Sequence, residues 1–353
     1  MSFLLILVLA VPGCSGQDLK RGPAEIVFVD RHMHEVTQLT FEGDNGEAYF
    51  SWDSTKLIFQ SNRNSYACDK IWIMNADGSD SHMVSPGYGA HTCSFFMPGD
   101  ARIVFASTSH LPGDCPPKIK TPEARGHVWP LYPYDIYSAR SDGSGMQKLT
   151  GNPEYDAEPV VSSDGRLIVF GSKREGDFDV YVMNSDGSDV RRLTDRIGYD
   201  GGPWFSPDGT KIVWRAWYPE TQAEKDMWQN CMEDNSIIPM PLDLWIMDSD
   251  GSQKKMILKN GATNFCPSWH PDGKRIIFSS NMDDWREELG VFGHNFELYL
   301  INSDGTGLER ITFNKVFDGF PMFSPDGRRL AFASNRNPEK PRATDIFIAD
   351  WVE

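Results

Sequence analysis

Six polar side chains recur at one position of an internal repeat, nine residues before the tight turn of each copy. These residues are Asn45, His91, Asp156, Asp200, Asn264 and Asp318. Carboxylates, amides and an imidazole gathered around an axis would bind a polar ligand or a divalent cation. Oxygen ligands favour Ca²⁺ or Mg²⁺, whereas an imidazole among the ligands would also allow Mn²⁺ or Zn²⁺ to bind. The candidate metal ligands are the four ionisable members of the set, His91, Asp156, Asp200 and Asp318. The alternative is that these polar residues simply begin a strand.

Two further residues extend this candidate set. Glu158 stands two positions after Asp156, so both carboxylates would face the same side of a regular strand. Such a pair suits metal binding or general-base chemistry, although two solvated acids are the alternative. Arg215 stands where most copies of the repeat have a small residue, which predicts that its guanidinium contacts a carboxylate across the centre of the fold. Glu158 and Arg215 therefore join the candidate ligand-binding residues.

The elements that position these residues are the strands of a repeated unit. Residues 203–214, 267–278 and 321–332 share an aromatic strand, a Pro-Asp-Gly turn and a second strand. The Asp-Gly pair supplies the positive φ of a tight hairpin, and the flanking aromatic and β-branched residues favour strands. A second hairpin follows in each unit, as in residues 180–188, where Met-Asn-Ser-Asp-Gly-Ser forms the turn. Each unit therefore predicts four antiparallel strands.

The spacing of the units predicts how they assemble. The first turn recurs at positions 54, 100, 165, 209, 273 and 327, and the shortest intervals, 44 and 46 residues, match one blade of a β-propeller. The longer intervals require insertions between the second and third strands, which we place at residues 111–134, 217–242 and 282–297. Six such blades hide their sheet faces by closing radially.

The two ends of the chain are expected to complete the ring together. Residues 26–30 and 36–40 match the last two strands of a unit, while the C-terminal unit ends after residues 346–352. We therefore predict an all-β, six-bladed β-propeller of four-stranded antiparallel blades over residues 21–353, closed by N- and C-terminal strands in one blade. The two ends offer one strand too many, and either could be displaced.

The insertions lie on the face where the six polar residues begin their strands, and they are rich in aromatic residues. The residues concerned are His127, Trp129, Tyr132, Tyr134, Trp217, Trp228 and Met232. Aromatic loops above a central channel suit the capture of a peptide or a sugar, but they could equally pack on themselves as a cap. His127 and Tyr134 complete the candidate ligand-binding residues.

The paired turn motifs resemble the WD40-like repeat of TolB-type propellers. The resemblance rests on Ser-Pro-Asp-Gly followed by Met-Asn-x-Asp-Gly-Ser and covers residues 26–352. It implies a periplasmic binding module, a peptidase gate or a metal-dependent lyase, because one fold serves several functions. A TolB protein proper has an α/β domain ahead of its propeller. Only about a dozen residues separate Cys14 from the first strand, so we expect that domain to be missing here.

The N-terminus indicates export. Residues 1–20 contain an apolar run that suits a signal peptide, and Val-Pro-Gly-Cys14 resembles a bacterial lipobox, in which the cysteine is acylated. An ordinary cleaved signal is the alternative. The expected location is the periplasm or cell envelope, as a lipoprotein or otherwise secreted. The five other cysteines show no zinc-site spacing but permit one or two disulfides in an oxidising compartment.

The net charge of −16 argues against a nucleic acid or an anionic membrane surface as a partner. We therefore expect membrane contact only through an N-terminal lipid anchor. Our first hypothesis is an exported, non-enzymatic binding or scaffold propeller that recognises a protein, peptide or glycan on the face with the long loops. The alternative is a metal-dependent lyase or hydrolase with its site at the channel mouth, as in propellers that resemble oligogalacturonate lyase.

Overall fold

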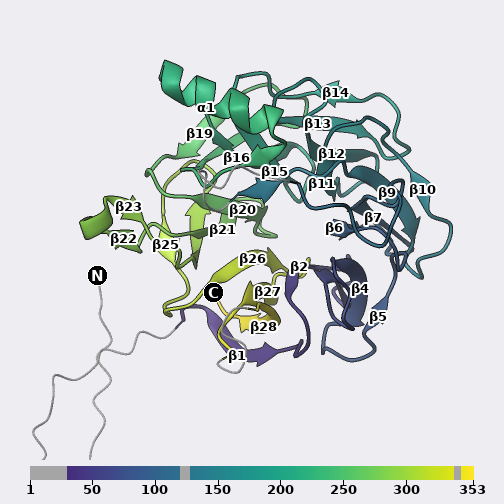
Figure 1. Ribbon diagram of the computed structural model, residues 1–353. Coiled ribbons are helices and arrows are strands. Elements are labelled where there is room, and N and C mark those ends of the chain that lie inside the picture. The colour runs from purple at the N-terminus through teal and green to yellow at the C-terminus, as the bar shows by residue number, and fades with distance from the viewer. Residues whose placement is uncertain (1–29, 120–127, 338–342) are drawn as a thin grey trace, which may run out of the picture.

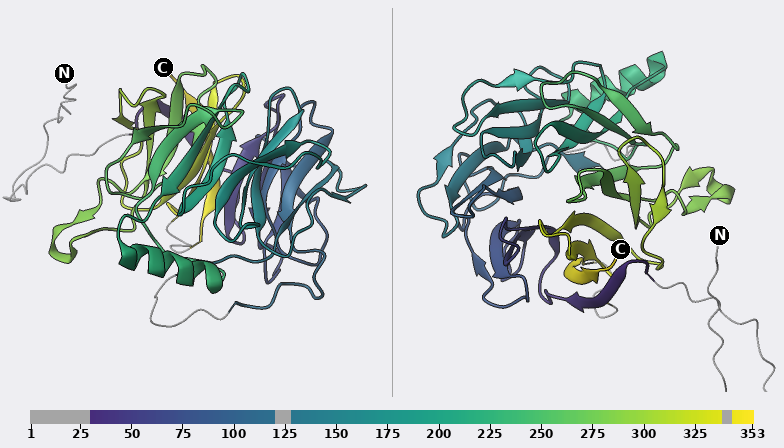
Figure 2. Two further views of the ribbon diagram at one scale, coloured as in Figure 1. Left: turned by 90° about the horizontal axis from the view of Figure 1, so that it is seen from above. Right: turned by 180° about the vertical axis from the view of Figure 1, so that it is seen from behind.

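Six four-stranded antiparallel sheets stand around a central axis as the blades of a β-propeller (Figures 1 and 2). The computed structural model describes residues 30–119, 128–337 and 343–353. Within each blade the strands run in order from the axis outward, and each pairs with the next. The predicted fold class is therefore confirmed. No helix in the described residues is both long enough and apolar enough to cross a membrane.

The first three blades follow chain order. Blade 1 consists of β2 (Asn45–Phe50), β3 (Lys56–Ser61), β4 (Lys70–Asn75) and β5 (His82–Met83). Blade 2 consists of β6 (His91–Phe96), β7 (Arg102–Ser107), β9 (Asp135–Arg140) and β10 (Gln147–Lys148). Blade 3 consists of β11 (Asp156–Val161), β12 (Leu167–Ser172), β13 (Asp179–Asn184) and β14 (Arg191–Arg192).

The remaining blades complete the ring. Blade 4 consists of β15 (Tyr199–Phe205), β16 (Lys211–Trp217), β18 (Asp243–Asp248) and β19 (Lys255–Leu258). Blade 5 consists of β20 (Asn264–Trp269), β21 (Arg275–Ser280), β24 (Glu297–Asn302) and β25 (Glu309–Arg310). Blade 6 consists of β26 (Asp318–Phe323), β27 (Arg329–Ser334), β28 (Asp345–Trp351) and, outermost, β1 (Met33–Gln38).

Blade 6 shows how the ring closes. Its outer strand β1 pairs antiparallel with β28, so that Met33 lies opposite Trp351 and Gln38 lies opposite Phe347. The prediction that both ends share one blade is confirmed, and the N-terminal strand supplies the outermost position. The other strand predicted near the N-terminus, at residues 26–30, falls almost entirely outside the described residues.

The insertions contain the other elements. They are β8 (Trp129–Pro130), α1 (Gln222–Glu233), β17 (Ser236–Ile237), β22 (Trp285–Arg286), a 3-10 helix (Glu287–Leu289) and β23 (Val291–Phe292). Strands β22 and β23 form a hairpin on blade 5. Helix α1 begins at a capping box, in which Thr221 and Glu224 satisfy each other's backbone N–H groups. All of the insertions follow the second strand of a blade, as predicted.

An aromatic pair joins the second and third strands of every blade. In blade 3, Phe170 lies opposite Tyr181 with ring centroids 5.9 Å apart, and Arg174 lies over both rings. Cross-strand aromatic pairs stabilise sheets by roughly 0.2–1 kcal/mol each. The equivalent pairs are Phe59 with Trp72, Phe105 with Tyr137, Trp214 with Trp245, Phe278 with Tyr299 and Phe332 with Phe347.

A β-bulge interrupts the innermost strand of every blade two residues after the recurring polar position. In blade 3 the pairing passes from Ala157 opposite Gly171 to Val160 opposite Val169, which leaves one extra residue on the inner strand. Glu158 there has a φ of 59°, in the left-handed region that non-glycine residues seldom adopt. Because the bulge breaks the alternation of side chains, residues two apart no longer share a face at this point.

Candidate functional site

The six recurring polar residues lie inside the blades. Each is at most 1% exposed. Asp156 accepts hydrogen bonds from Ser172 Oγ at 2.5 Å and from Arg174 Nη2 at 3.0 Å, both within blade 3. In blade 1, Asn45 Nδ2 donates to the Thr344 carbonyl of blade 6 at 3.2 Å. The expectation that these side chains line the channel is therefore wrong. They connect strands and neighbouring blades.

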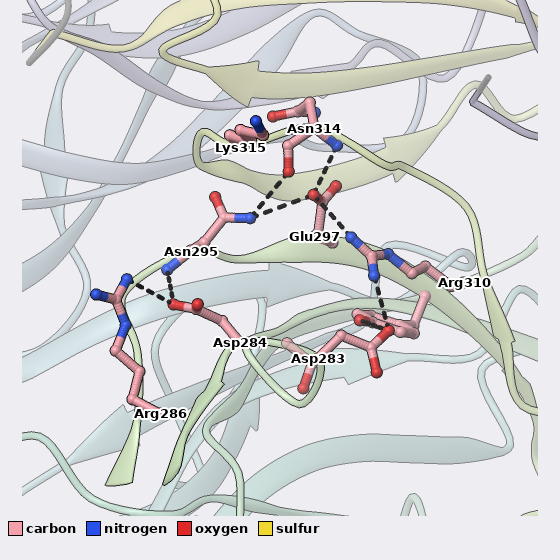
Figure 3. A pocket seen from close by; sticks show the side chains of 10 residues that line it. Asp283, Asp284, Arg286, Asn295, Glu297, Arg310, Asn314 and Lys315 are labelled. Carbon is pink, nitrogen blue, oxygen red and sulfur yellow. Dashed lines mark hydrogen bonds and ion pairs between the residues drawn. The ribbon is translucent and has the colours of Figure 1, made fainter. Parts of the chain in front are cut away.

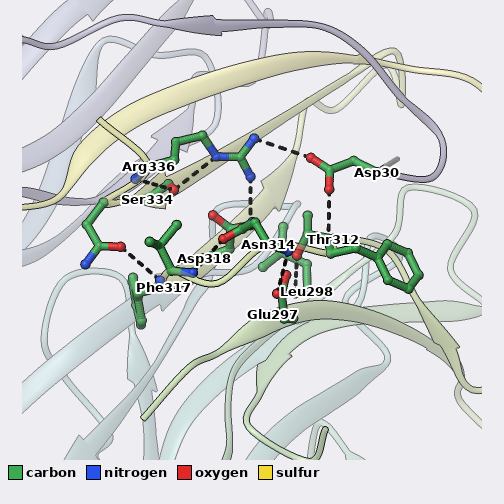
Figure 4. A network of polar contacts seen from close by, with 12 residues as sticks. Asp30, Glu297, Leu298, Thr312, Asn314, Phe317, Asp318, Ser334 and Arg336 are labelled. Atoms are coloured by element: carbon green, nitrogen blue, oxygen red, sulfur yellow. Dashed lines mark hydrogen bonds and ion pairs between the residues drawn. The ribbon is translucent and has the colours of Figure 1, made fainter. Parts of the chain in front are cut away.

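Asp318 shows how such a connection is made in blade 6 (Figure 4). Its Oδ2 accepts from Asn314 Nδ2 at 2.6 Å and from Arg336 Nη2 at 2.7 Å. Arg336 Nη1 also reaches Asp30 at 3.3 Å, which ties the segment before β1 to blade 6. Burial raises the pKa of Asp318, and the Arg336 guanidinium opposes that rise.

The other members of the set are held in the same way. Asp200 accepts from Trp214 Nε1 at 2.6 Å and from the Tyr218 hydroxyl at 2.7 Å, and burial raises its pKa to about 7. Asn264 Oδ1 accepts from Ser280 Oγ at 2.7 Å. His91 Nε2 lies 2.9 Å from the Tyr88 carbonyl, and burial lowers the pKa of its imidazole to about 4.

The four candidate metal ligands are not brought together. Across residues 30–119, 128–337 and 343–353, no three His, Cys, Asp or Glu side chains are grouped so that they could hold a metal ion. His91, Asp156, Asp200 and Asp318 start the inner strands of four different blades and are engaged separately. They therefore form no shared metal site. Binding of a cation elsewhere stays a prediction for metal analysis of the purified protein.

The residues at the bulges meet at the centre instead. Glu158 of blade 3 lies 2.6 Å from Arg215 Nη2 of blade 4, and its second oxygen accepts from the Gly202 backbone N–H at 2.8 Å. The Tyr199 hydroxyl accepts from Arg215 Nε at 3.0 Å. Arg215 contacts a carboxylate as predicted, but this carboxylate belongs to the neighbouring blade 3 and does not lie across the centre of the fold. Gly202 makes room for it, because a Cβ there would lie 2.6 Å from Arg215 Nη1.

Glu47 and two cysteines extend this central cluster to blades 1, 2 and 5. Burial raises the pKa of Glu47 to about 7, opposed by a hydrogen bond with the Cys93 thiol. Burial also raises the pKa of both Cys93 and Cys266 well above the ordinary value, so both thiols stay protonated at neutral pH. Arg215 Nη1 lies 3.8 Å from Cys266 Sγ. The cluster thus contains one ion pair, one titratable acid and two neutral thiols.

Aromatic rings pack farther along the same inner strands. Trp204 of blade 4 contacts Tyr49 of blade 1 and Phe95 of blade 2 in edge-to-face geometry, with centroids 5.0 and 5.3 Å apart. These contacts cross from one blade to another that is not its neighbour. The inner strands are therefore held together by apolar packing beyond the polar cluster, and side chains fill that part of the propeller axis.

The insertions of blades 2 and 4 join into one cap. Strand β8 pairs with β17, and the Leu131 backbone N–H donates to the Asn235 carbonyl at 2.8 Å. Helix α1 packs Trp228, which is 2% exposed, against Tyr199, whose hydroxyl holds Arg215. Trp228 Nε1 donates to Asp177 of blade 3 at 2.6 Å. The self-packed alternative is therefore confirmed for this part, and Trp129 is half exposed at its edge.

The other predicted loop residues differ in their placement. Tyr134 lies beside Tyr132 and Tyr155 with centroids 6.3 and 6.0 Å away, and burial raises its pKa. His127 and Cys14 lie outside the described residues. A disulfide joins Cys68, between β3 and β4, to Cys115 in the blade 2 insertion, with Cα atoms 6.0 Å apart. One bridge is consistent with the expected one or two.

Sequence reasoning did not select Glu47, Cys93, Cys266 or Tyr199 as site residues. Regular alternation placed the first three on the same strand face as the recurring polar residues. The bulge separates the two sets, so that the bulge residues lie at the centre and the recurring polar residues do not. Tyr199 precedes Asp200 directly, and only its contact with Arg215 shows its role.

No family model matches this chain. The Tol-Pal system protein TolB of Alcanivorax borkumensis is 31% identical over 97 residues, which are 28% of this chain and only 20% of that protein. The chain thus spans a small part of the length of this relative.

Two solved structures share the fold over most of both chains. A protein of Agrobacterium tumefaciens assigned as TolB superposes with a TM-score of 0.58 at 19% identity, over 88% of this chain and 91% of its own. An oligogalacturonate lyase of Vibrio parahaemolyticus superposes with a TM-score of 0.54 at 13% identity, over 92% and 95%. At such low identity both show a common fold alone. The chain is therefore a six-bladed β-propeller that is similar to TolB proteins in part of its sequence and in its fold.

Proposed function

We propose that this chain is a binding propeller of the bacterial envelope that holds a protein partner on its capped face. The observation on which the proposal rests is the joined cap, in which β8 and β17 connect two insertions above one face of the ring. A cap with the half-exposed Trp129 at its edge suits protein recognition, where aromatic side chains often contribute most of the binding energy. The likeness to a Tol-Pal system protein supports a protein over a glycan as the partner.

A periplasmic or envelope location is part of the same proposal. The apolar N-terminal segment has the composition of an export signal. The Cys68–Cys115 disulfide adds independent support, because disulfides persist in oxidising compartments such as the periplasm. Acylation of Cys14 would anchor the propeller to a membrane, and mass spectrometry of the mature N-terminus tests it.

Site-specific photo-crosslinking in intact cells tests the protein-binding proposal. A photoreactive amino acid replaces Trp129 on the capped face or Leu308, which is 46% exposed beside the third-to-fourth strand turn of blade 5 on the opposite face. We expect a discrete crosslinked protein from position 129 and none from position 308. Equal crosslinking from both positions, or none from position 129, would overturn the proposal.

The alternative of metal-dependent lyase or hydrolase chemistry receives no support from the site. The lyase match is a likeness of fold at 13% identity. The four proposed ligands lie apart in separate blades, and Glu158 is engaged by Arg215 and Gly202. We therefore place binding ahead of catalysis.

A further inference from the structure

A lysine replaces a recurring acid at the start of the third strand of blade 1. The other five blades begin this strand with a carboxylate, and the residues concerned are Asp135, Asp179, Asp243, Glu297 and Asp345. In blade 5, Glu297 accepts from Arg310 of the outermost strand at 3.1 Å (Figure 3). In blade 1, β4 begins with Lys70, and Met83 takes the place of that arginine. Blade 1, which is described throughout, therefore lacks this ion pair.

Lys70 is enclosed beside the disulfide instead. It is 1% exposed, and its ammonium donates to the Gly89 carbonyl and lies 3.4 Å from Cys68 Sγ. Burial lowers the pKa of Lys70, and the charges of Asp114 and Asp69 oppose that shift from a distance. Among the described residues, no carboxylate forms an ion pair with this ammonium. The charge of Lys70 is thus held against a sulfur atom.

The surroundings of Cys68 suit its reduced form. Its Sγ lies 3.5 Å from the Gly89 carbonyl oxygen and 3.4 Å from the Asp114 carbonyl oxygen. A disulfide sulfur has no hydrogen to donate, whereas a thiol would donate to one of these carbonyls and a thiolate would accept from Lys70. A neighbouring cation also lowers the pKa of a thiol. Reduced Cys68 therefore finds a hydrogen-bond partner in either protonation state.

Cys115 is the end of the bridge that an external thiol can approach. It is partly exposed in the blade 2 insertion, and residues 112–114 and 117–118 on either side of it are exposed. A thiolate that attacks Cys115 Sγ displaces Cys68, which is the sulfur beside the ammonium. A thiol with a lower pKa is the faster leaving group. The geometry therefore favours attack at Cys115 with Cys68 leaving.

We propose that Cys68–Cys115 is an exchangeable disulfide whose substrate is an external dithiol, and that the Lys70 ammonium stabilises the leaving Cys68 thiolate. One thiolate of the dithiol bonds to Cys115 Sγ, and the bond between the two cysteines breaks with its electron pair on Cys68. The second thiolate of the dithiol then displaces Cys115 and closes a disulfide within the reagent. Two electrons and two protons thus pass from the dithiol to the bridge. The proposal does not depend on the protein-binding proposal.

Redox equilibration of the purified, folded full chain tests this proposal. Mixtures of reduced and oxidised dithiothreitol set the potential, and alkylation followed by peptide mass spectrometry measures the open fraction of the bridge. We expect Lys70→Met, which fills the space without a charge, to shift the equilibrium at least about tenfold toward the disulfide, or about 30 mV. Lys118→Met removes an exposed charge from the same insertion and should leave the equilibrium unchanged.

A second measurement distinguishes this role of Lys70 from a structural one. In Cys115→Ser, the rate of Cys68 alkylation against pH gives the pKa of the free thiol, which we expect below its ordinary value of about 8.5. Adding Lys70→Met should return the pKa to that value. Lys70→Gln, which keeps a donor without the charge, should act in the same direction and replaces Lys70→Met if that variant does not fold.

Glutathione, a monothiol, identifies the sulfur that is attacked. An acid quench should trap the mixed disulfide on Cys115. A bridge that opens only when the chain is unfolded by urea, an equilibrium equal in the parent and the Lys70 variants, an equal shift in Lys118→Met, an ordinary pKa for Cys68, or an adduct on Cys68 would each refute the proposal.

Discussion

Arg215 Nη2 lies 2.6 Å from Glu158 Oε1 and so joins blade 4 to blade 3 at the centre of the ring. Both side chains are largely buried, at 14% and 17% exposure, and Tyr199 and Gly202 take up their remaining hydrogen bonds. Desolvating two buried charges costs free energy, and removing either partner leaves the charge of the other uncompensated. The consequences for stability are measurable.

Removing one partner of this pair should destabilise the propeller strongly. Arg215→Met leaves the Glu158 charge buried without its guanidinium, which we expect to lower the free energy of unfolding by about 3 kcal/mol. The double variant Glu158→Gln, Arg215→Met removes both charges and should recover a large part of that loss. Urea unfolding checks this, and additive losses in the two single variants would contradict the coupling.

The pH dependence of stability should respond to Glu47. Its folded pKa of about 7 lies above the ordinary value of 4.5. Its contribution to stability is therefore fully present below about pH 4.5 and is lost as the pH rises through 7. We expect Glu47→Gln to flatten the fall in stability between pH 5 and 8 by about 1–3 kcal/mol relative to the parent.

Chemical unfolding at several pH values measures that difference. The matched control is Glu175→Gln, whose carboxylate is 54% exposed beside Arg192 in blade 3. This control should leave the pH profile parallel to that of the parent. An identical effect of the two substitutions would show that Glu47 does not titrate as described.

The disulfide should stabilise the insertion of blade 2. Cys68 and Cys115 are 47 residues apart, and a chain-entropy treatment of a loop of this length gives a stabilisation of about 4 kcal/mol. We expect the double variant Cys68→Ser, Cys115→Ser to unfold at a lower urea concentration. A reductant should lower the urea midpoint of unfolding of the parent protein and leave that of the double variant unchanged.

The cap should open separately from the blades. Trp228→Ala removes a buried ring and its hydrogen bond to Asp177. Substitutions of this kind typically lower the free energy of unfolding by about 3–5 kcal/mol. We expect faster hydrogen exchange in α1 and β17, with protection retained in the inner strands of the blades. Trp129→Ala, at a half-exposed position, is the control and should leave exchange in α1 unaltered.

The recurring polar residues should behave as structural connections. Asp156→Ala leaves Arg174 and Ser172 without their acceptor, and we expect the free energy of unfolding to fall by about 3 kcal/mol. Photo-crosslinking from position 129 should persist in this variant at temperatures where it is folded. Loss of crosslinking with unchanged stability would instead assign Asp156 to the binding surface.

The fold was predictable because its information is local and repeated. An Asp-Gly turn such as that at Asp208 specifies a hairpin by itself, four of the six first turns contain this pair, and six turns at blade spacing leave few alternatives. Arg215 was predictable for the same reason, since a departure from a repeat is visible only against the other copies. These two successes draw on comparison within the chain.

The contents of the site were less predictable for physical reasons. The bulge at Glu158 depends on a backbone geometry that no residue type here demands, so alternation placed Asp156 in the channel when it lies inside the blade. The pairing of β8 with β17 joins strands of two residues each, which leave no periodic pattern.

The pairing of β1 with β28 also has a consequence for the order in which the molecule forms. Met33 cannot meet Trp351 until β28 has been synthesised. Contacts between such distant segments form slowly, because the entropy of closing a long loop must be overcome first. The ring therefore stays open until β28 is available, and its closure is a late step of folding.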